Sequence, residues 1–360
     1  MPAITIANLD QVSNQWLTQV LTDSGALIAG SVTAFTLRRD ERRLSKVGYL
    51  ELVYSPDAKG ACPANLFLKI CATDLNGDFL GPSEVNYYAR DYVGVEGLPI
   101  LTCYDAVYSA ELGAYHILLD DVSATHRESH GRMPTLDYGL ALAEGLARMH
   151  ALWWGAARLA AGGEPIPTAA HIERYVSIAR AGLQPMLESC RDEIDSRWEI
   201  ALFDIFDHHP AKMVERTANG NGFTLVHGDA NPGNILAPVH GDRPVYLIDR
   251  QPFDWSLTTW IGASDIAYMT VHWWEPDVRR ELEIPILRRY HDHLLANGVT
   301  DYSWEQLLLD YRLSAVQSVY VASEWCRFED DCAELKWLWL MQLRRAMTAF
   351  FDLDCGGLWR

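Results

Sequence analysis

The first third of the chain alternates between hydrophobic and polar residues, which predicts β-strands. One helix is expected among the strands, after Gly81-Pro82-Ser83 and through EVNYYARDYV at 84–93. The strand segments are VTAFTLRR (32–39), VGYLELVYS (47–55), NLFLKICA (65–72) and AYHILLDD (114–121).

From about residue 135 the hydrophobic pattern takes the period of helices. Thr135 can cap a helix that places Leu136, Leu140, Ala143, Leu146, His150 and Trp153 on one face. Later helices are expected at 277–296, ended by Asn297-Gly298, from Ser303, which has capping-box spacing to Gln306, and through ELKWLWLMQLRRAMTAFF at 334–351. One segment between these helices, the island at residues 222–251, has the hydrophobic pattern of strands instead.

These patterns predict an α+β fold with two lobes. A β-rich N-terminal lobe is expected at 1–122 and a mostly helical C-terminal lobe at 123–360. The length of 360 residues and the 49% hydrophobic content allow two lobes with a sizeable core.

Charge and cysteine content narrow the class of protein. The formal net charge of −18 repels polyanions, so nucleic acid is not expected as a partner. Seven scattered cysteines without a CxxC pair indicate reduced thiols. The N-terminus lacks signal-peptide features, and no run of about 18 apolar residues occurs. A cytoplasmic protein that does not enter the membrane is therefore expected.

The island contains the densest group of chemically active residues, in HGDANPGNILAPVHGDRPVYLIDRQ at 227–251. Its second half predicts a β-hairpin whose connection contains Gly241-Asp242. The midpoint of Asn234 and Asp249 falls within this connection, so these two residues are expected opposite each other across the strands. An amide oxygen and a carboxylate can share Mg²⁺, and Asp229 beside them can orient a hydroxyl group and accept its proton.

The motif HGDANPGN followed by LIDRQ resembles that of the aminoglycoside phosphotransferase and choline kinase superfamily, whose members have a protein-kinase-like fold. The resemblance implies that Asp229 is the catalytic base and that Asn234 and Asp249 ligate Mg²⁺. His227 is expected to hold the loop in shape rather than to transfer protons.

The resemblance covers roughly residues 25–345 and lies near the ecdysteroid-kinase-like branch. It extends to GLARMHALWWG, with His150, and to ASDIAYM, with Asp265.

A kinase of this type needs a cation for the phosphates of ATP, and Lys69 is the best placed of the five lysines. Its expected partner is Glu84, because the pair resembles the strand lysine and helix glutamate of kinases. Alternatively, Lys69 reaches solvent and Glu84 interacts with the helix dipole.

Two further segments are expected to contact the nucleotide. By the resemblance, the adenine ring contacts the segment Leu119, Asp120, Asp121 and Val122. The phosphate-covering loop departs from the kinase pattern, because DERRLSKV at 40–47 contains no glycine. Ser45 can donate a hydroxyl there, although a solvated hairpin tip explains this residue equally well.

Protein substrates are not expected, because the D-F-G and A-P-E motifs of protein kinases are missing after Asp249. A small-molecule acceptor, cationic or ring-containing, fits the acidic charge and the thirteen tryptophans. Alternatively, most of these tryptophans belong to the core and the acids to the surface. The candidate lining residues are Asp254, Trp255, Trp260, Trp273, Trp274, Glu275, Glu324 and Trp325.

The sequence therefore predicts an ATP- and Mg²⁺-dependent kinase that phosphorylates a hydroxyl group of a small molecule. One alternative is a catalytically silent nucleotide-binding protein with the same fold. A metallohydrolase that uses His227, Asp229 and Asp249 is a third hypothesis, although tight multi-histidine spacing is missing.

Overall fold

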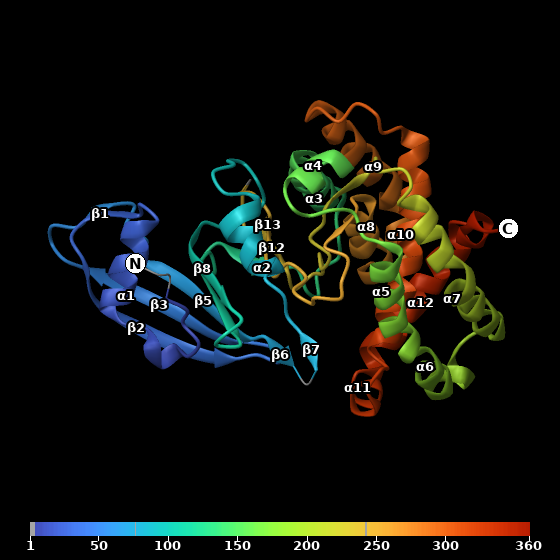
Figure 1. The fold of residues 1–360 in the computed structure, drawn as a ribbon, viewed down its shortest axis with the longest axis horizontal. Helices are drawn as coiled ribbons and strands as arrows, with labels where there is room; N and C mark the ends of the chain where they lie inside the picture. Colours follow the sequence, from blue (N-terminus) through green and yellow to red (C-terminus); the bar gives the residue numbers. More distant parts are fainter. Residues whose placement is uncertain (1–3, 76, 242) are drawn as a thin grey trace. The chain divides into compact units, whose positions relative to one another are not determined.

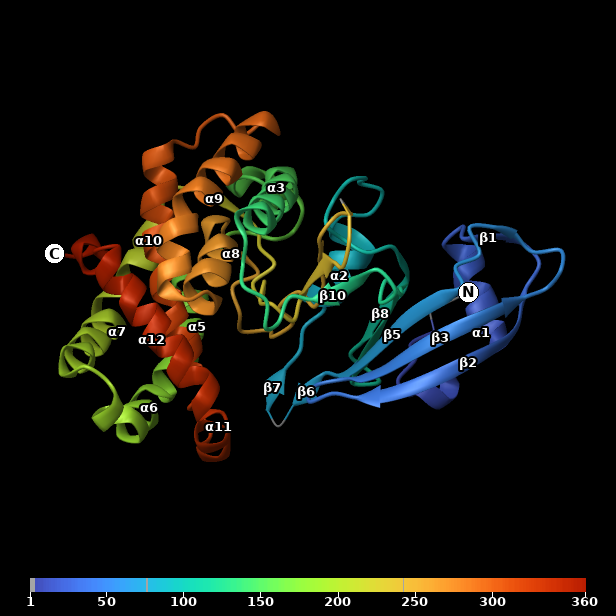
Figure 2. The same cartoon turned by 180° about the vertical axis from the view of Figure 1, so that it is seen from behind.

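The chain divides into two compact units in the computed structural model, which describes residues 4–75, 77–241 and 243–360. The first unit comprises Met1–Arg127 and Leu236–Asp254, and the second comprises Glu128–Ile235 and Trp255–Arg360. The first unit contains most of the strands and the second most of the helices (Figures 1 and 2). The predicted α+β class, with a β-rich N-terminal part and a helical C-terminal part, is confirmed.

The first unit is built on an antiparallel five-stranded sheet. All four predicted strands are present, but the edge strand β8 was not predicted, because each of its residues is half-buried and none marks an inner or outer face. In order across the sheet, the strands are β2 (Val32–Glu41), β3 (Lys46–Tyr54), β5 (Asn65–Ala72), β9 (Ala114–Asp120) and β8 (Cys103–Ser109).

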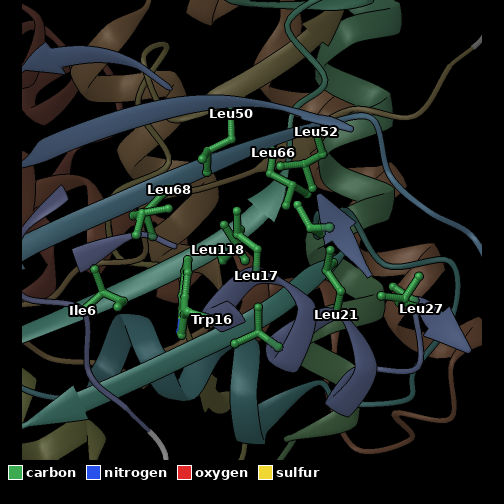
Figure 3. Close-up of a cluster of buried hydrophobic side chains, with 14 of the residues drawn as sticks. Ile6, Trp16, Leu17, Leu21, Leu27, Leu50, Leu52, Leu66, Leu68 and Leu118 are labelled. Carbon is green, nitrogen blue, oxygen red and sulfur yellow. The ribbon is translucent and has the colours of Figure 1, made fainter. Parts of the chain in front are cut away.

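A helix that the sequence analysis did not predict, α1 (Asn14–Asp23), contributes four buried residues to this unit's core. The side chain of Ser13 caps α1 by accepting a hydrogen bond from the backbone N–H of Trp16. Figure 3 shows Trp16, Leu17 and Leu21 of α1 packed on leucines of the sheet. The sheet residues are Leu50, Leu66, Leu68 and Leu118.

The predicted helix at 84–93 is shorter than expected and changes type. It begins as α2 (Ser83–Asn86) and continues as the π-helical turn η2 (Tyr87–Asp91). Asp91, at the end of η2, forms a buried ion pair with Arg250, whose Nη1 lies 2.6 Å from Asp91 Oδ2. This pair fixes the position of the residue that directly follows Asp249.

The predicted hairpin is present as β12 (Ile235–Pro238) and β13 (Tyr246–Leu247), which are neighbours in a sheet with β10 (His126–Glu128). Its strands are shorter than the sequence suggested, so Asn234 precedes β12 and Asp249 follows β13. Gly241 in the connection adopts φ +75°, a backbone conformation that favours glycine. Asp242, the other residue expected in this turn, lies outside the described residues.

The predicted helix starts and stops of the second unit largely agree with the structure. Thr135 caps α3 (Leu136–Leu152), and Asn297 ends α9 (Pro276–Ala296). The hydroxyl of Ser303 caps α10 (Trp304–Glu324), but the Gln306 side chain donates to Asp310 instead of completing the capping box. The last predicted helix, at 334–351, is present as α12 (Lys336–Asp352), and a short helix that was not predicted, α11 (Glu329–Glu334), precedes it.

The other elements of the second unit complete its helical packing and lead into the central loop. They are α4 (Ala156–Ala161), α5 (Ala169–Ala181), α6 (Leu183–Cys190), η3 (Arg191–Glu193), α7 (Ser196–Arg216), β11 (Phe223–Leu225), β14 (Thr259–Ile261), α8 (Ala263–Ala267), η4 (Tyr268–His272) and η5 (Cys355–Leu358). Strand β11 pairs with β14, and the chain that leaves β11 enters the loop at 227–234.

Acidification should destabilise the second unit through His209 in α7. Its Nε2–H donates to Leu313 O and its Nδ1 accepts from Tyr320 OH, and burial lowers the pKa of His209 from 6.5 to about 4. Between these values the unfolded chain binds the extra proton, so His209 alone should lower the free energy of unfolding by about 2 kcal/mol from pH 7 to pH 5. Urea unfolding at the two pH values measures this difference.

A neighbouring histidine provides the control. His208→Gln, at a half-exposed position, should leave the pH dependence unchanged, whereas His209→Gln should make it shallower by the contribution of His209, and buried His272 should supply the remainder. Equal slopes for the two variants would contradict the assignment to His209.

Two simple expectations from composition can be compared with the structure. All seven cysteines, each at a described position, are free thiols. Within residues 4–75, 77–241 and 243–360, none of the helices is both long and apolar enough to cross a membrane.

Candidate active site

Lys69, Glu84 and Asp249 form a cluster in the first unit. Lys69 Nζ lies 2.8 Å from Glu84 Oε1 and 3.0 Å from Asp249 Oδ1. The side chain of Glu84 is only 1% exposed, and its second oxygen, Oε2, accepts a 2.5 Å hydrogen bond from the Tyr115 hydroxyl. The structure therefore contains the ion pair expected between Lys69 and Glu84, and it adds Asp249 and Tyr115.

The pKa of Lys69 reflects two opposed effects. Burial lowers this pKa, but the carboxylates of Asp249 and Glu84 raise it more strongly, so it lies above its ordinary value. Burial also raises the pKa of Glu84, and Lys69 partly offsets that shift. Lys69 is therefore a firmly positioned cation, as the binding of phosphate groups requires.

Asp249 has an unusual backbone conformation, with φ +58°. A left-handed conformation is uncommon for a residue other than glycine, and such residues cluster at functional sites. The contact with Lys69 and the ion pair of the adjacent Arg250 hold Asp249 in this conformation. Its side chain is 40% exposed, so solvent and ions can reach the carboxylate.

The loop at 227–234 in the second unit is anchored by the buried side chain of Asp265 in α8. Its carboxylate accepts hydrogen bonds from the backbone N–H groups of His227 (2.7 Å) and Gly228 (2.8 Å). His150 Nε2 lies 3.1 Å from Asp265 Oδ2, and its Nδ1 lies 2.8 Å from the Tyr290 hydroxyl. Burial would raise the pKa of Asp265, but the hydrogen bond and charge of His150 lower it, with help from His227 and Gly228.

Side-chain donors on the loop and on η4 hold the carboxylate of Asp229. Asn231 Nδ2 (2.9 Å) and the Tyr268 hydroxyl (2.8 Å) donate to Oδ1, and Asn234 Nδ2 (2.9 Å) donates to Oδ2. The backbone N–H of Asp229 donates a hydrogen bond to the ring Nδ1 of His227, with 3.4 Å between the two nitrogens. His227 thus contacts the backbone of the loop.

The residues proposed for Mg²⁺ have donor chemistry that fits the ion. Asn234 uses its Nδ2 group to donate to the backbone oxygen (3.0 Å) and side chain of Asp229, so its Oδ1 points away from that carboxylate. Asp249 supplies an exposed carboxylate held by Lys69. Amide and carboxylate oxygens are ligands that Mg²⁺ prefers, with phosphate oxygens and waters completing its shell.

The residues expected near a nucleotide base lie at the end of β9. Across the sheet, Leu119 pairs with Phe67, and Ile117 pairs with Lys69, so Leu119 shares a sheet face with the lysine. Leu119 is buried, and the three residues after it are half-buried. These three residues are Asp120, Asp121 and Val122.

Ser45 lies in the turn between β2 and β3. The turn is closed by a hydrogen bond from the Arg42 backbone N–H to Ser45 O (2.8 Å), without a glycine. Two residues after Ser45, Val47 pairs with Lys69 across the sheet. The turn therefore leads directly to the strand beside the lysine.

The tryptophans suggested as acceptor contacts lie in different surroundings. Trp260 is 1% exposed and packs edge-on against Phe223, and Trp274 is also buried, in the helical core. Trp255 is buried beside Tyr175.

The other acceptor candidates are more accessible. Trp273 is half-buried and packs edge-on against His272. Trp325, at the end of α10, is also half-buried. Glu324 accepts a hydrogen bond from Arg327 (2.9 Å), and exposed Glu275 accepts one from Arg345. Asp254 is exposed and belongs to the first unit.

Sequence reasoning missed two contacts to the key carboxylates. Tyr268 lies in the segment ASDIAYM, but no spacing rule connects its hydroxyl to Asp229, 39 residues earlier. Tyr115 lies in an apolar strand, and nothing in the sequence indicates that its hydroxyl donates to Glu84. Both hydrogen bonds join residues that are distant in the sequence, so they can be recognised only once the fold is known.

No family model matches the sequence, and no curated protein matches it. Solved structures do match. The GDP complex of an aminoglycoside 2′-phosphotransferase-IIIa variant has a TM-score of 0.52 at 13% identity, covering 95% of this chain and 100% of that one. A glucosamine kinase has a TM-score of 0.49 at 16% identity, covering 91% and 95%. The AMP complex of a spectinomycin phosphotransferase has a TM-score of 0.48 at 12% identity, covering 94% and 98%.

The chain therefore has the protein-kinase-like fold of the aminoglycoside phosphotransferases. The resemblance inferred from HGDANPGN and LIDRQ is confirmed at the level of this fold. The comparisons do not support the ecdysteroid-kinase-like branch in particular.

Proposed function

We propose that this protein is an ATP- and Mg²⁺-dependent kinase that phosphorylates a hydroxyl group of a small molecule. The observation that carries the proposal is the fixed orientation of the Asp229 carboxylate. Its carboxylate is oriented by three side-chain donors within a loop that buried Asp265 anchors. Such rigid positioning is what a general base for an incoming hydroxyl requires.

In the proposed reaction, Asp229 accepts the proton of the acceptor hydroxyl as its oxygen attacks the γ-phosphorus of ATP. The new oxygen–phosphorus bond forms as the bond from the γ-phosphorus to the bridging oxygen breaks. The electron pair of the broken bond remains on the β-phosphate of ADP. Lys69 contacts the α- and β-phosphates, and Glu84 holds the lysine in position.

Asn234 and Asp249 are the proposed ligands of Mg²⁺, which supplies charge neutralisation at the phosphates when bound. Leu119 to Val122 and Ser45 are the proposed contacts for the base and the phosphates. In the turn between β2 and β3, backbone N–H groups and the Ser45 hydroxyl would donate hydrogen bonds to the phosphates, as the glycine-rich loop does in protein kinases.

For the acceptor we propose contacts with Trp273 and Glu324. Trp273 lies next to Tyr268, the residue that donates to Asp229, and packs edge-on against His272. The charge of Glu324 also acts on Tyr268, and an aromatic ring together with an acidic group suits a ring-containing or cationic compound.

An ADP-release screen tests the function. Purified protein with Mg·ATP is offered kanamycin, spectinomycin, glucosamine, choline, and a set of neutral sugars and sterols, each with the Asp229→Asn variant as control. We expect at least one compound to raise ADP release in the wild type and not in the variant. Thermal stabilisation by Mg·ATP without transfer to any compound would instead favour the catalytically silent alternative.

A further inference from the structure

The hydroxyl of Tyr268 reaches the Asp229 carboxylate from outside the loop. Tyr268 is the first residue of η4, a π-helical turn that continues α8, and its hydroxyl donates to Asp229 Oδ1 at 2.8 Å. A π-helical turn inserts one residue relative to an α-helix, which redirects the side chains that follow, and such turns often mark functional sites. The local irregularity thus coincides with the contact to Asp229.

The ring of Tyr268 is fixed in orientation by its neighbours. It stacks on the His272 ring, with the ring centroids 5.1 Å apart and the planes at 18°. His272 is fully buried, and burial, aided by the charge of Arg345, lowers its pKa to about 3, so the stacked imidazole is neutral. Burial and then the negative charge of Asp229 raise the pKa of Tyr268 well above 10, which keeps its hydroxyl a donor.

Asn231 and Asn234, which also donate to Asp229, cannot play the same part. Asn231 and Asn234 belong to the same loop as Asp229, so they orient the carboxylate only relative to that loop. Tyr268 connects the carboxylate to the helical core. Asp265, three residues earlier, holds the backbone of the same loop at His227. The segment from 265 to 268 therefore fixes both the backbone and the side chain of the loop.

We propose that Tyr268 is a positioning residue for phosphate transfer, which sets the direction of the Asp229 carboxylate toward the acceptor hydroxyl. This inference rests on the proposed function. Without the phenol, Oδ1 keeps the hydrogen bond from Asn231, but the carboxylate loses the hydrogen bond that comes from the helical core. Small misplacements of a reacting group reduce rates strongly, by about 10²-fold for a shift of 1 Å.

The test is Tyr268→Phe, which keeps the ring on His272 and removes only the hydroxyl. The reaction contains Mg·ATP and the compound from the screen that gives the fastest ADP release. We expect kcat to fall about 10- to 100-fold. The KM values for ATP and the acceptor should stay within about twofold, because the phenol touches Asp229 rather than either substrate.

A matched tyrosine separates positioning from stability. Tyr302 is also buried in the second unit, and its hydroxyl donates to the Asp310 carboxylate at 2.7 Å. Tyr302→Phe should lower the Tm but leave kcat within about twofold of the wild type.

A double-mutant cycle supplies the second readout. In the Asp229→Asn background, Tyr268→Phe should lower kcat by less than about twofold, because the effect of the phenol passes through the carboxylate. A purely structural role would give the same loss in both backgrounds and would overturn the proposal.

The outcomes distinguish the two levels of inference. If the wild type transfers phosphate and Tyr268→Phe retains its kcat, Tyr268 does not position Asp229, although the kinase function stands. If the wild type transfers phosphate to none of the compounds, the proposed function fails and the role of Tyr268 fails with it.

Discussion

Asp229→Asn should lower kcat for phosphate transfer by about 10²- to 10⁴-fold, the range that general base catalysis contributes. Asparagine keeps the size and shape of the side chain but removes its ability to take up the acceptor proton. The dissociation constant for Mg·ATP should change little, since Asp229 is not among the proposed phosphate or metal contacts. Steady-state kinetics and isothermal titration with Mg·ATP measure the two quantities.

The control for this variant is Asp292→Asn, which changes an exposed aspartate of α9 by the same chemical step. It should retain full activity. Normal turnover by Asp229→Asn would show that Asp229 is not the general base. Loss of both turnover and nucleotide binding would indicate that the asparagine disturbs the hydrogen bonds from Asn231 and Asn234.

Features encoded by local sequence were predicted well. The four strands with an alternating pattern, the cap at Thr135 and the helix end at Asn297 depend on residues within a few positions of one another. The pairing of Lys69 with Glu84 could also be anticipated, because a lysine in an apolar strand needs a partner and the next helix offers one.

The features that were missed depend on contacts between distant segments. Strand β8 carries no alternation, because all of its side chains are half-buried at the edge of the sheet. The π-helical turns at Tyr87 and Tyr268 add a residue that a period of 3.6 does not anticipate. Asp249 meets Lys69 across 180 residues, a contact that only the fold creates.

Lys69 has two proposed roles, contact with the phosphates of ATP and charge compensation of buried Glu84, and a single substitution of Lys69 would affect both. Lys69→Met should lower kcat/KM for ATP by about 10²- to 10³-fold, the loss typical of removing one preorganised donor from a developing charge. The same change leaves Glu84 buried without the positive charge of Lys69, with the Tyr115 hydroxyl at its second oxygen. It should therefore also reduce the free energy of unfolding by about 3–5 kcal/mol, as when one partner of a buried ion pair is removed.

The double variant Lys69→Met with Glu84→Gln distinguishes these two effects. Glutamine removes the uncompensated negative charge and can still accept the Tyr115 hydrogen bond, so much of the lost stability should return. Activity should not return, because the cation for the phosphates is still missing. Urea unfolding and ATP-dependent kinetics measure the two quantities, with Lys59→Met, at an exposed position of the same unit, as the control. Recovery of activity together with stability would show that Lys69 serves the fold and not the nucleotide.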